Sequence, residues 1–372
     1  MKISKLIQNT ERVSDPRRIY GNLRHKLVDI LVIGLLSFLC GGKDFADMEV
    51  YGKARIEWLK GFLELPNGIP DSDTFRRVFE RINPKELSKC LNNWIMHERQ
   101  ATALKTVSID GKTIRGSGND YHEPYQVVSA WASEHGITLG QVTVDEGSNE
   151  ITAIPQLLDI IDVKGAVVTI DAMGSQKTIA AKIIELEADY LLALKANHKN
   201  LLKQVKELFA SIDTGHAEPL LDTFTENKSG HGRFETRIID VISADLISSK
   251  SSWKGLESIV RVKYISICAK SGNETLTIRY FLSSLPANAR RLRSIIKSHW
   301  SIESVLHWTL DVIFEEDKSK SKKDNSPLNL NILRKTALSI LLPKKQGRIS
   351  LQKMMFRAAL EEEYLEMVLF GM

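Results

Sequence analysis

The sequence predicts an α/β fold, with a helical region before the core and further helices after it. Residues 22–63 carry apolar side chains at helical intervals, and residues 106–146 show the pattern of short strands. Helical and strand-like segments then alternate up to residue 211. The chain has 372 residues, 43% of them hydrophobic, so two or three domains with a substantial core are expected.

The first region, residues 1–95, is expected to be all-helical. Its most apolar run, residues 30–40, is far shorter than the roughly 20 residues that span a bilayer, so it predicts a buried helix. After a turn at 65–70, Asp71 or Ser72 can cap the next helix.

That capped helix leaves Arg76 and Arg77 outside its apolar face. A helix, a short turn and a capped helix with exposed arginines suit a helix-turn-helix DNA-binding region. An ordinary helical hairpin fits the same pattern equally well.

The second region, residues 96–212, is expected to form the catalytic core. Three strands joined by short turns come first, and two continuous apolar runs indicate strands covered on both faces. This order of elements is that of a ribonuclease-H-like domain. The expected strands are 106–112, 125–133, 137–146, 166–170 and 190–195, and the expected helices are 153–162, 175–188 and 200–211.

The third region, residues 213–286, is expected to be a mostly β insertion in that core, with strands at 234–242, 259–267 and 276–282. The last region, 287–372, returns to a helical pattern. One helical stretch is expected from about 288 to 314, and two basic C-terminal helices at about 328–342 and 350–370.

Three acidic residues stand in positions that suit a two-metal site for phosphoryl transfer. Asp110 and Asp171 each end an apolar strand, and Glu303 lies on a late helix. The two strands are neighbours in the predicted core, so the aspartates are expected to converge. Hard cations such as Mg²⁺, or Mn²⁺ as a substitute, prefer carboxylate oxygens, and two ions can activate an attacking oxygen and stabilise the leaving 3′ oxygen.

Each of these acids also has a purely structural interpretation. Asp-Gly after a strand is a common turn, and a lone helical glutamate is usually solvated. His299, His307 and Asp311 recur with Glu303 every four residues and would share one helical face next to the metal ligands. The alternative is a polar stripe on a helix whose other side is in the core.

Basic residues are concentrated near the predicted site. The net charge of +5 favours a polyanionic partner only mildly, so their distribution matters more. A track for the phosphate backbone and a solvated basic surface both fit the pattern. The predicted DNA contacts, besides Arg76 and Arg77, are Lys112, Arg115, Lys195, Arg290, Arg293, Lys318 and Lys320.

The three cysteines, Cys40, Cys90 and Cys268, are far apart and form no Cys-x-x-Cys motif, which argues against a disulfide framework or a zinc knuckle. No signal-peptide pattern is present at the N-terminus. The sequence therefore predicts a cytoplasmic protein without a membrane partner, and the predicted DNA contacts associate it with the nucleoid.

Several ordered motifs resemble one known family. The chain is similar to the H-repeat-associated proteins, a branch of the bacterial DDE insertion-sequence transposases, over nearly its whole length. The motifs include Leu65-Pro-Asn-Gly-Ile-Pro70, Ile109-Asp-Gly-Lys-Thr-Ile-Arg-Gly116, Thr169-Ile-Asp-Ala-Met-Gly174, Asp189-Tyr-Leu-Leu-Ala-Leu-Lys195 and His299-Trp-Ser-Ile-Glu303.

The resemblance implies that Asp110, Asp171 and Glu303 form the DDE triad and use Mg²⁺, with two ions expected, to cut and transfer DNA. It also implies double-stranded DNA with inverted-repeat ends as the partner and a homodimer when two ends are paired. Many related transposases have Arg four residues before the glutamate and Lys seven after it. Here these positions are His299 and Leu310, so the residue that holds the flanking phosphate stays open.

Three functions remain in competition at this point. The first is a metal-dependent DNA transposase. The second is a catalytically silent or domesticated DNA-binding relative, and the third is a metal-dependent nuclease of the same fold that cleaves without joining strands.

Overall fold

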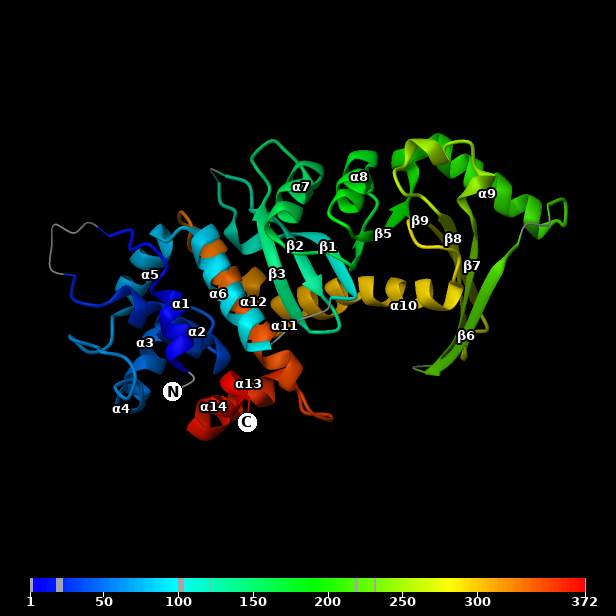
Figure 1. Cartoon of the computed structure of the whole chain (residues 1–372). Helices are drawn as coiled ribbons and strands as arrows, with labels where there is room; N and C mark the ends of the chain where they lie inside the picture. The colour runs from blue at the N-terminus through cyan, green and yellow to red at the C-terminus, as the bar shows by residue number, and fades with distance from the viewer. Residues whose placement is uncertain are drawn as a thin grey trace. The chain divides into compact units, whose positions relative to one another are not determined.

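The computed structural model describes residues 3–17, 23–99, 104–120, 122–217, 220–230 and 232–371. In these residues the protein is a mixed α/β structure with one large sheet, whose nine strands follow the order β3-β2-β1-β4-β5-β9-β8-β7-β6 (Figure 1). The strands are β1 (Thr106–Thr113), β2 (Gln126–Ala132), β3 (Ile137–Thr143), β4 (Val167–Ile170), β5 (Asp189–Leu194), β6 (Asp222–Gly230), β7 (Arg233–Ser243), β8 (Ser258–Cys268) and β9 (Glu274–Ser283).

Helices precede the sheet, alternate with its strands and follow it. They are α1 (Ile3–Thr10), α2 (Leu27–Leu39), α3 (Phe45–Ala54), α4 (Ile56–Leu59), α5 (Ser72–Arg81), α6 (Pro84–Arg99), α7 (Glu150–Ile160), α8 (Lys177–Glu185), α9 (Lys199–Asp213), α10 (Ala289–His299), α11 (Trp308–Val312), α12 (Ser326–Leu341), α13 (Leu351–Leu360) and α14 (Glu362–Phe370).

The chain divides into two compact units. Unit 1 comprises Met1–Thr102, Gly111–Val144 and Glu303–Met372. Unit 2 comprises Ala103–Asp110 and Asp145–Ile302. The chain passes between the units before β1, within β1, after Val144 and before Glu303. The four regions predicted from the sequence group the chain differently, and their boundaries stay predictions.

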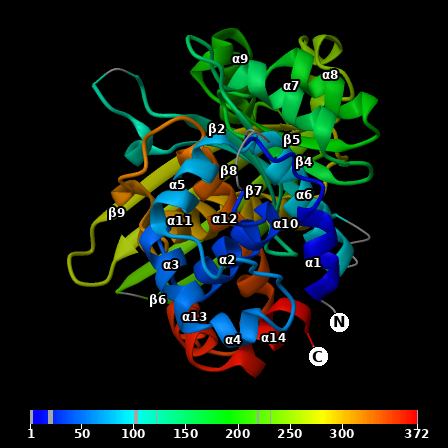
Figure 2. The ribbon, with the colours of Figure 1, turned by 90° about the vertical axis from the view of Figure 1, so that its left-hand side faces the viewer.

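Unit 1 is built around α12, which is buried along its whole length. Helices α2, α5 and α6 pack against α12, and Figure 2 shows α2 and α5 near it. The predicted buried helix at 30–40 is confirmed as α2, in which nearly every residue is apolar and buried. A helix that is apolar on all sides has to be surrounded by other elements.

The capped helix predicted after the turn is also confirmed. Asp71 precedes α5, and its side chain accepts a hydrogen bond from the Thr74 backbone N–H. Phe75 and Val78 are buried on one face, whereas the Arg76 side chain is partly exposed. Residue 22, the predicted start of the N-terminal helices, lies outside the described residues.

Unit 2 contains the parallel part of the sheet. β1 pairs with β4, and β4 with β5, both in parallel, so the two acid-bearing strands are neighbours as predicted. Helices α7 and α8 lie on one side of these strands and α10 on the other (Figure 1). Val167 and Leu191 pack on the α10 side with Leu292. Because helices cover both faces of these strands, their sequences are continuous apolar runs.

The predicted β insertion extends the same sheet. β9 pairs with β5 in antiparallel fashion, and β8, β7 and β6 follow outward. The sequence predicted three of these strands and missed β6. Its sequence, DTFTENKSG, lacks an apolar face, because β6 is a mostly exposed strand at the edge of the sheet.

The structure adds detail to two predicted helical stretches. The stretch from 288 to 314 is helical as predicted, but a π-helical turn, Ile302–His307, lies between α10 and α11. The last predicted helix is two helices, α13 and α14, because Glu361 has an extended backbone (φ −115°, ψ 114°).

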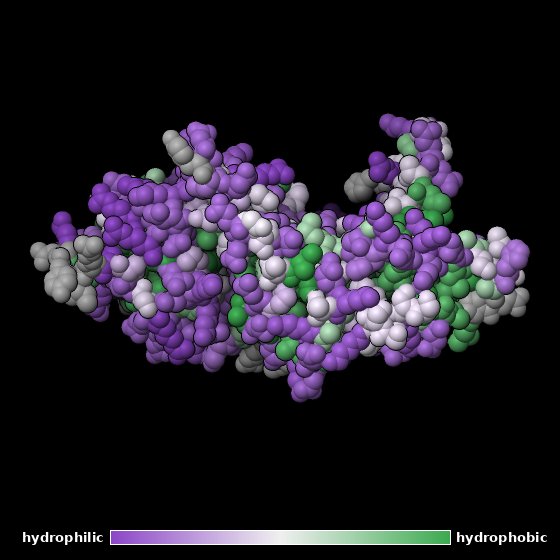
Figure 3. Space-filling view, turned by 90° about the horizontal axis from the view of Figure 1, so that it is seen from above, coloured by the Kyte–Doolittle hydropathy of each residue, from purple (hydrophilic) through white to green (hydrophobic). Residues whose placement is uncertain are grey.

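No helix in the described part of the chain is long and apolar enough to cross a membrane. The face in Figure 3 is mainly hydrophilic, and apolar residues on it form small separate groups.

Candidate active site

Asp110 and Asp171 occupy equivalent positions on neighbouring parallel strands. Ile109 of β1 and Ile170 of β4 are partners in the register, and each aspartate is the next residue. Ile109 is fully buried and Ile170 is 2% exposed, whereas both aspartates are only partly buried. The prediction that Asp110 ends its strand is wrong, because β1 continues to Thr113, whereas β4 ends directly before Asp171. The pairing of β1 with β4 nevertheless ends just before both aspartates, so the two carboxylates come to the same edge of the paired strands, within reach of solvent.

The Asp171 carboxylate is oriented by the backbone of the turn that follows it. Its Oδ1 accepts hydrogen bonds from the N–H groups of Met173 (3.0 Å) and Gly174 (3.3 Å). A Cβ atom at Gly174 would lie 2.4 Å from side-chain atoms of both Ile154 and Ile170. Glycine at this position lets the turn close tightly, so the carboxylate has a defined direction.

His299, predicted to lie next to the metal ligands, packs beneath this edge. Its Nδ1 is 2.9 Å from Thr169 Oγ1, which donates to Ser108 Oγ (3.2 Å). Because Thr169 has a single hydroxyl proton, the imidazole must donate from Nδ1 in this arrangement. Burial lowers the pKa of His299 to about 4, although the nearby Asp171 charge opposes this shift. The side chain is therefore neutral near pH 7.

Glu303 belongs to unit 1, whereas Asp110 and Asp171 belong to unit 2. It is exposed at the start of the π-helical turn, between the buried Ile302 and Leu306. A π turn, in which residues five apart are bonded instead of four, replaces the regular α-helix at Glu303, so the predicted face shared with its acidic and histidine neighbours stays a prediction. Such turns frequently occur at functional sites.

The remaining predicted neighbours, His307 and Asp311, lie in unit 1. Burial, together with the smaller effect of the Lys335 and Lys112 charges, lowers the pKa of His307 to about 3. Asp311 Oδ1 is 2.6 Å from Lys112 Nζ.

Several of the predicted DNA-binding cations have acidic partners. Besides Lys112, Arg293 pairs with Glu226, and Arg76 pairs with both Asp73 and Glu80. Arg77, Arg115 and Lys318 make longer ion pairs of 3.9, 3.7 and 3.5 Å and are well exposed.

Three of the predicted DNA-binding cations differ from these in their ion pairing. Across the described residues no acidic partner is found for Lys195, Arg290 or Lys320, although Arg290 lies over the Phe224 ring. These side chains are the most available to an external anion.

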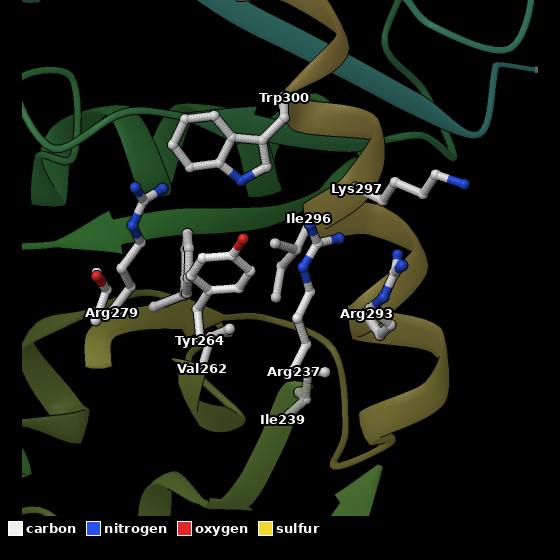
Figure 4. A pocket seen from close by; sticks show the side chains of 11 residues that line it. Arg237, Ile239, Val262, Tyr264, Arg279, Arg293, Ile296, Lys297 and Trp300 are labelled. Atoms are coloured by element: carbon white, nitrogen blue, oxygen red, sulfur yellow. The ribbon is translucent and has the colours of Figure 1, made fainter. Parts of the chain in front are cut away.

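Sequence reasoning missed a basic and aromatic pocket in unit 2. The pocket has a volume of about 380 Å³ and lies between α10 and strands β7 to β9. The Arg279 guanidinium lies 4.2 Å from the centre of the Trp300 ring, and that of Arg237 lies 5.3 Å from the Tyr264 ring. In Figure 4 these side chains face one another, and Lys297 extends away from them. Alternate strand residues supply the arginines, so no short motif marks them.

The chemistry of the aspartates fits a hard divalent cation, because both are partly solvated carboxylates at one sheet edge and Asp171 is already oriented. Among all described side chains, no group of three His, Cys, Asp or Glu residues is positioned to hold a metal ion.

Comparison with known families decides the class of protein. Residues 102–340 match the family model "Transposase DDE domain", and residues 7–95 match the model "DDE_Tnp_1-associated". The chain belongs to the DDE transposase family. Proteins with this domain generally use divalent metal ions.

Relatives match over the whole chain. "H repeat-associated putative transposase YhhI" of Escherichia coli K12 is 35% identical, covering 100% of this chain and 99% of that protein. "Putative transposase YncI" of E. coli O157:H7 is also 35% identical, over 99% of this chain and 95% of that protein. The resemblance to H-repeat-associated proteins is thereby confirmed. A solved piggyBac transposase complex with hairpin DNA aligns over 98% of this chain and 78% of that chain, at 12% identity and with a TM-score of 0.43.

Proposed function

We propose that this DDE transposase cuts and joins DNA at the ends of an insertion sequence, with Asp110, Asp171 and Glu303 as its catalytic metal ligands. The observation that carries the proposal is the register of β1 and β4, which gives two carboxylates equivalent positions on adjacent strands. The order of the strands supports a ribonuclease-H-like core, extended by β6 to β9.

The three acids have distinct local supports in this proposal. Asp110 and Asp171 hold their positions through the buried strands, and Asp171 is directed by two backbone N–H groups. Glu303 is the third ligand, on the π-helical turn. Two bound Mg²⁺ ions, or Mn²⁺ in their place, would activate the attacking oxygen and stabilise the leaving 3′ oxygen. No protein nucleophile is needed, since water or a 3′-hydroxyl attacks in line.

His299 supports the acids without titrating. As a neutral donor to Thr169 it adds no positive charge beside Asp171, so the carboxylate keeps its affinity for cations. His307 and Asp311 are proposed to support the Glu303 segment in the same indirect way.

The DNA partner is proposed to lie along the cationic residues. The charges of Lys195 and Arg279 both act on His299, as does Asp171, so cations stand close to the proposed catalytic edge. Together with Arg290, Lys318 and Lys320, they suit the phosphates of double-stranded DNA. The exposed Arg77 of α5 suits recognition of the inverted repeats, and a homodimer would hold two ends together.

The test is cleavage of end-labelled DNA that carries the flanking inverted repeats, in Mg²⁺ and in EDTA. Wild-type protein is expected to cut at the repeat ends only with the metal. Asp110→Asn and Glu303→Gln should bind the same DNA and leave it uncut. Tight binding without cleavage by wild-type protein in Mg²⁺ or Mn²⁺ would favour the silent DNA-binding relative. Cleavage without strand joining would favour the nuclease.

A further inference from the structure

Strand β1 continues past Asp110 to Thr113, and Lys112 near its end makes an ion pair inside unit 1. Lys112 Nζ lies 2.6 Å from Asp311 Oδ1. The Lys112 side chain is only 9% exposed, and that of Asp311 is 36% exposed. Lys112 follows Asp110 by two residues, and Asp311 is on α11, directly after the turn that carries Glu303. Each partner therefore belongs to a segment that also bears a proposed catalytic acid.

A second contact joins the same two segments. At Gly116, a Cβ atom would lie 2.9 Å from the carbonyl oxygen of Ser319, 3.0 Å from that of Glu316 and 3.2 Å from that of Asp317. Backbone oxygens cannot move aside as a flexible side chain can. The chain after β1 thus rests directly on the short helical turn Glu316–Lys318, and only glycine permits this approach.

That turn is itself anchored in the core of unit 1. Glu316 is fully buried, and its Oε1 accepts hydrogen bonds from Asn331 Nδ2 (2.8 Å) and from Arg334 (3.4 Å) of α12. The anchor gives the segment after α11 a fixed base, against which the end of β1 is held.

The burial of Lys112 and its short ion pair argue against its use as a free phosphate-binding cation. A largely buried lysine with a carboxylate partner would have to lose that partner to reach DNA, which leaves a buried charge unpaired. The same geometry suits an ion pair that holds its two chain segments at fixed positions relative to each other.

We propose that Lys112, Asp311 and Gly116 form a clamp inside unit 1 that holds the segment of Glu303 against the end of β1 that follows Asp110. They act through the acids and do not touch substrate. The proposal rests on the proposed function, and it gives a physical reason for lysine and glycine in the motif Ile109-Asp-Gly-Lys-Thr-Ile-Arg-Gly116.

The test uses the full-length protein and a charge swap. Lys112→Asp and Asp311→Lys should each slow single-turnover cleavage roughly 10- to 100-fold, since a misplacement of about 1 Å can cost about 100-fold. DNA affinity should stay within about twofold. The double variant Lys112→Asp with Asp311→Lys should regain at least about tenfold over either single change.

Lys182→Ala provides a matched control, because Lys182 pairs with Asp159 at the same 2.6 Å in unit 2. It should cleave like wild type. Weakened DNA binding in Lys112→Asp that the swap does not restore would overturn the proposal and make Lys112 a phosphate contact. Wild-type cleavage rates in the single variants would also overturn it.

Hydrogen exchange of the segment 302–312 separates failure of the clamp from failure of the proposed function. Each single charge reversal should speed amide exchange there, and the swap should restore protection. If wild-type protein cuts no DNA, the proposed function fails while exchange still decides on the clamp. Unchanged exchange in the single variants would exclude the clamp.

Discussion

The proposed catalytic acids come from two regions that are stabilised in different ways. The edge that carries Asp110 and Asp171 rests on apolar strands, with Ile109 and Ile170 almost completely buried. The segment that follows Glu303 rests on buried polar groups, among which Glu316 and Arg334 are at most 1% exposed.

The difference has an energetic consequence. An apolar strand tolerates a conservative change, because a neighbouring side chain still excludes water. A buried charge depends on its partner, so removal of one group leaves the other buried and unpaired. The Glu303 region is therefore expected to be the more sensitive of the two to single substitutions.

The largest effect on stability is expected for Arg334→Met. It leaves Glu316 buried without its cation and should lower the free energy of unfolding by about 3–5 kcal/mol. Ile170→Val, in the apolar region, should cost only about 0.5–1.5 kcal/mol. Urea denaturation followed by fluorescence checks both values.

The double replacement of Arg334 and Glu316 by methionine sharpens this comparison. Because no charge is then left unpaired, it should be less destabilising than Arg334→Met alone. If Arg334→Met lowers the free energy of unfolding no more than Ile170→Val does, the Glu303 region is not the more sensitive of the two. An exposed pair gives the baseline: Lys53→Ala, which removes a partner of Glu49, should change stability by less than about 1 kcal/mol.

A smaller effect concerns the pH dependence of unit 1. Lys335 is buried and donates to Ser129 Oγ and Gln141 Oε1, each at 2.7 Å. Burial lowers the pKa of Lys335 to about 7 from its ordinary 10.5. Between these values the unfolded chain binds more protons than the folded one, so this lysine makes stability rise as pH increases from 7 to 10.5.

Lys335→Met should remove that contribution. The slope of unfolding free energy against pH should be smaller in the variant than in wild type within this window, and equal outside it. Denaturant titrations at pH 7, 8 and 9 measure the slope. Parallel curves for the two proteins would show that Lys335 does not titrate in this range.

The same contrast explains what could be predicted from the sequence. Apolar runs predicted the strands that carry Asp110 and Asp171, and the residue type before a helical pattern predicted the cap at Asp71, since each depends on local sequence. Strand β6 and the π turn at Glu303 left no such pattern. β6 is an exposed edge, and a π turn differs from an α-helix only in which backbone groups bond.

Pairings between polar residues that are distant in the sequence could not be predicted from it either. Lys112 was expected to face DNA, yet it pairs with Asp311, which is 199 positions away. The residues Arg279 and Trp300 are brought together by the antiparallel strands and α10, and neither alone suggests a pocket.

The most direct test of the central claim is a double-mutant cycle across the two regions. Single-turnover cleavage would be measured for Asp171→Asn, Glu303→Gln and the variant with both changes, with DNA binding measured alongside. If both acids serve one metal-dependent site, each single change removes nearly all activity and the double variant is no slower than the slower single one. If instead the two losses multiply, or Glu303→Gln cleaves at the wild-type rate, Glu303 does not act in one site with the aspartates.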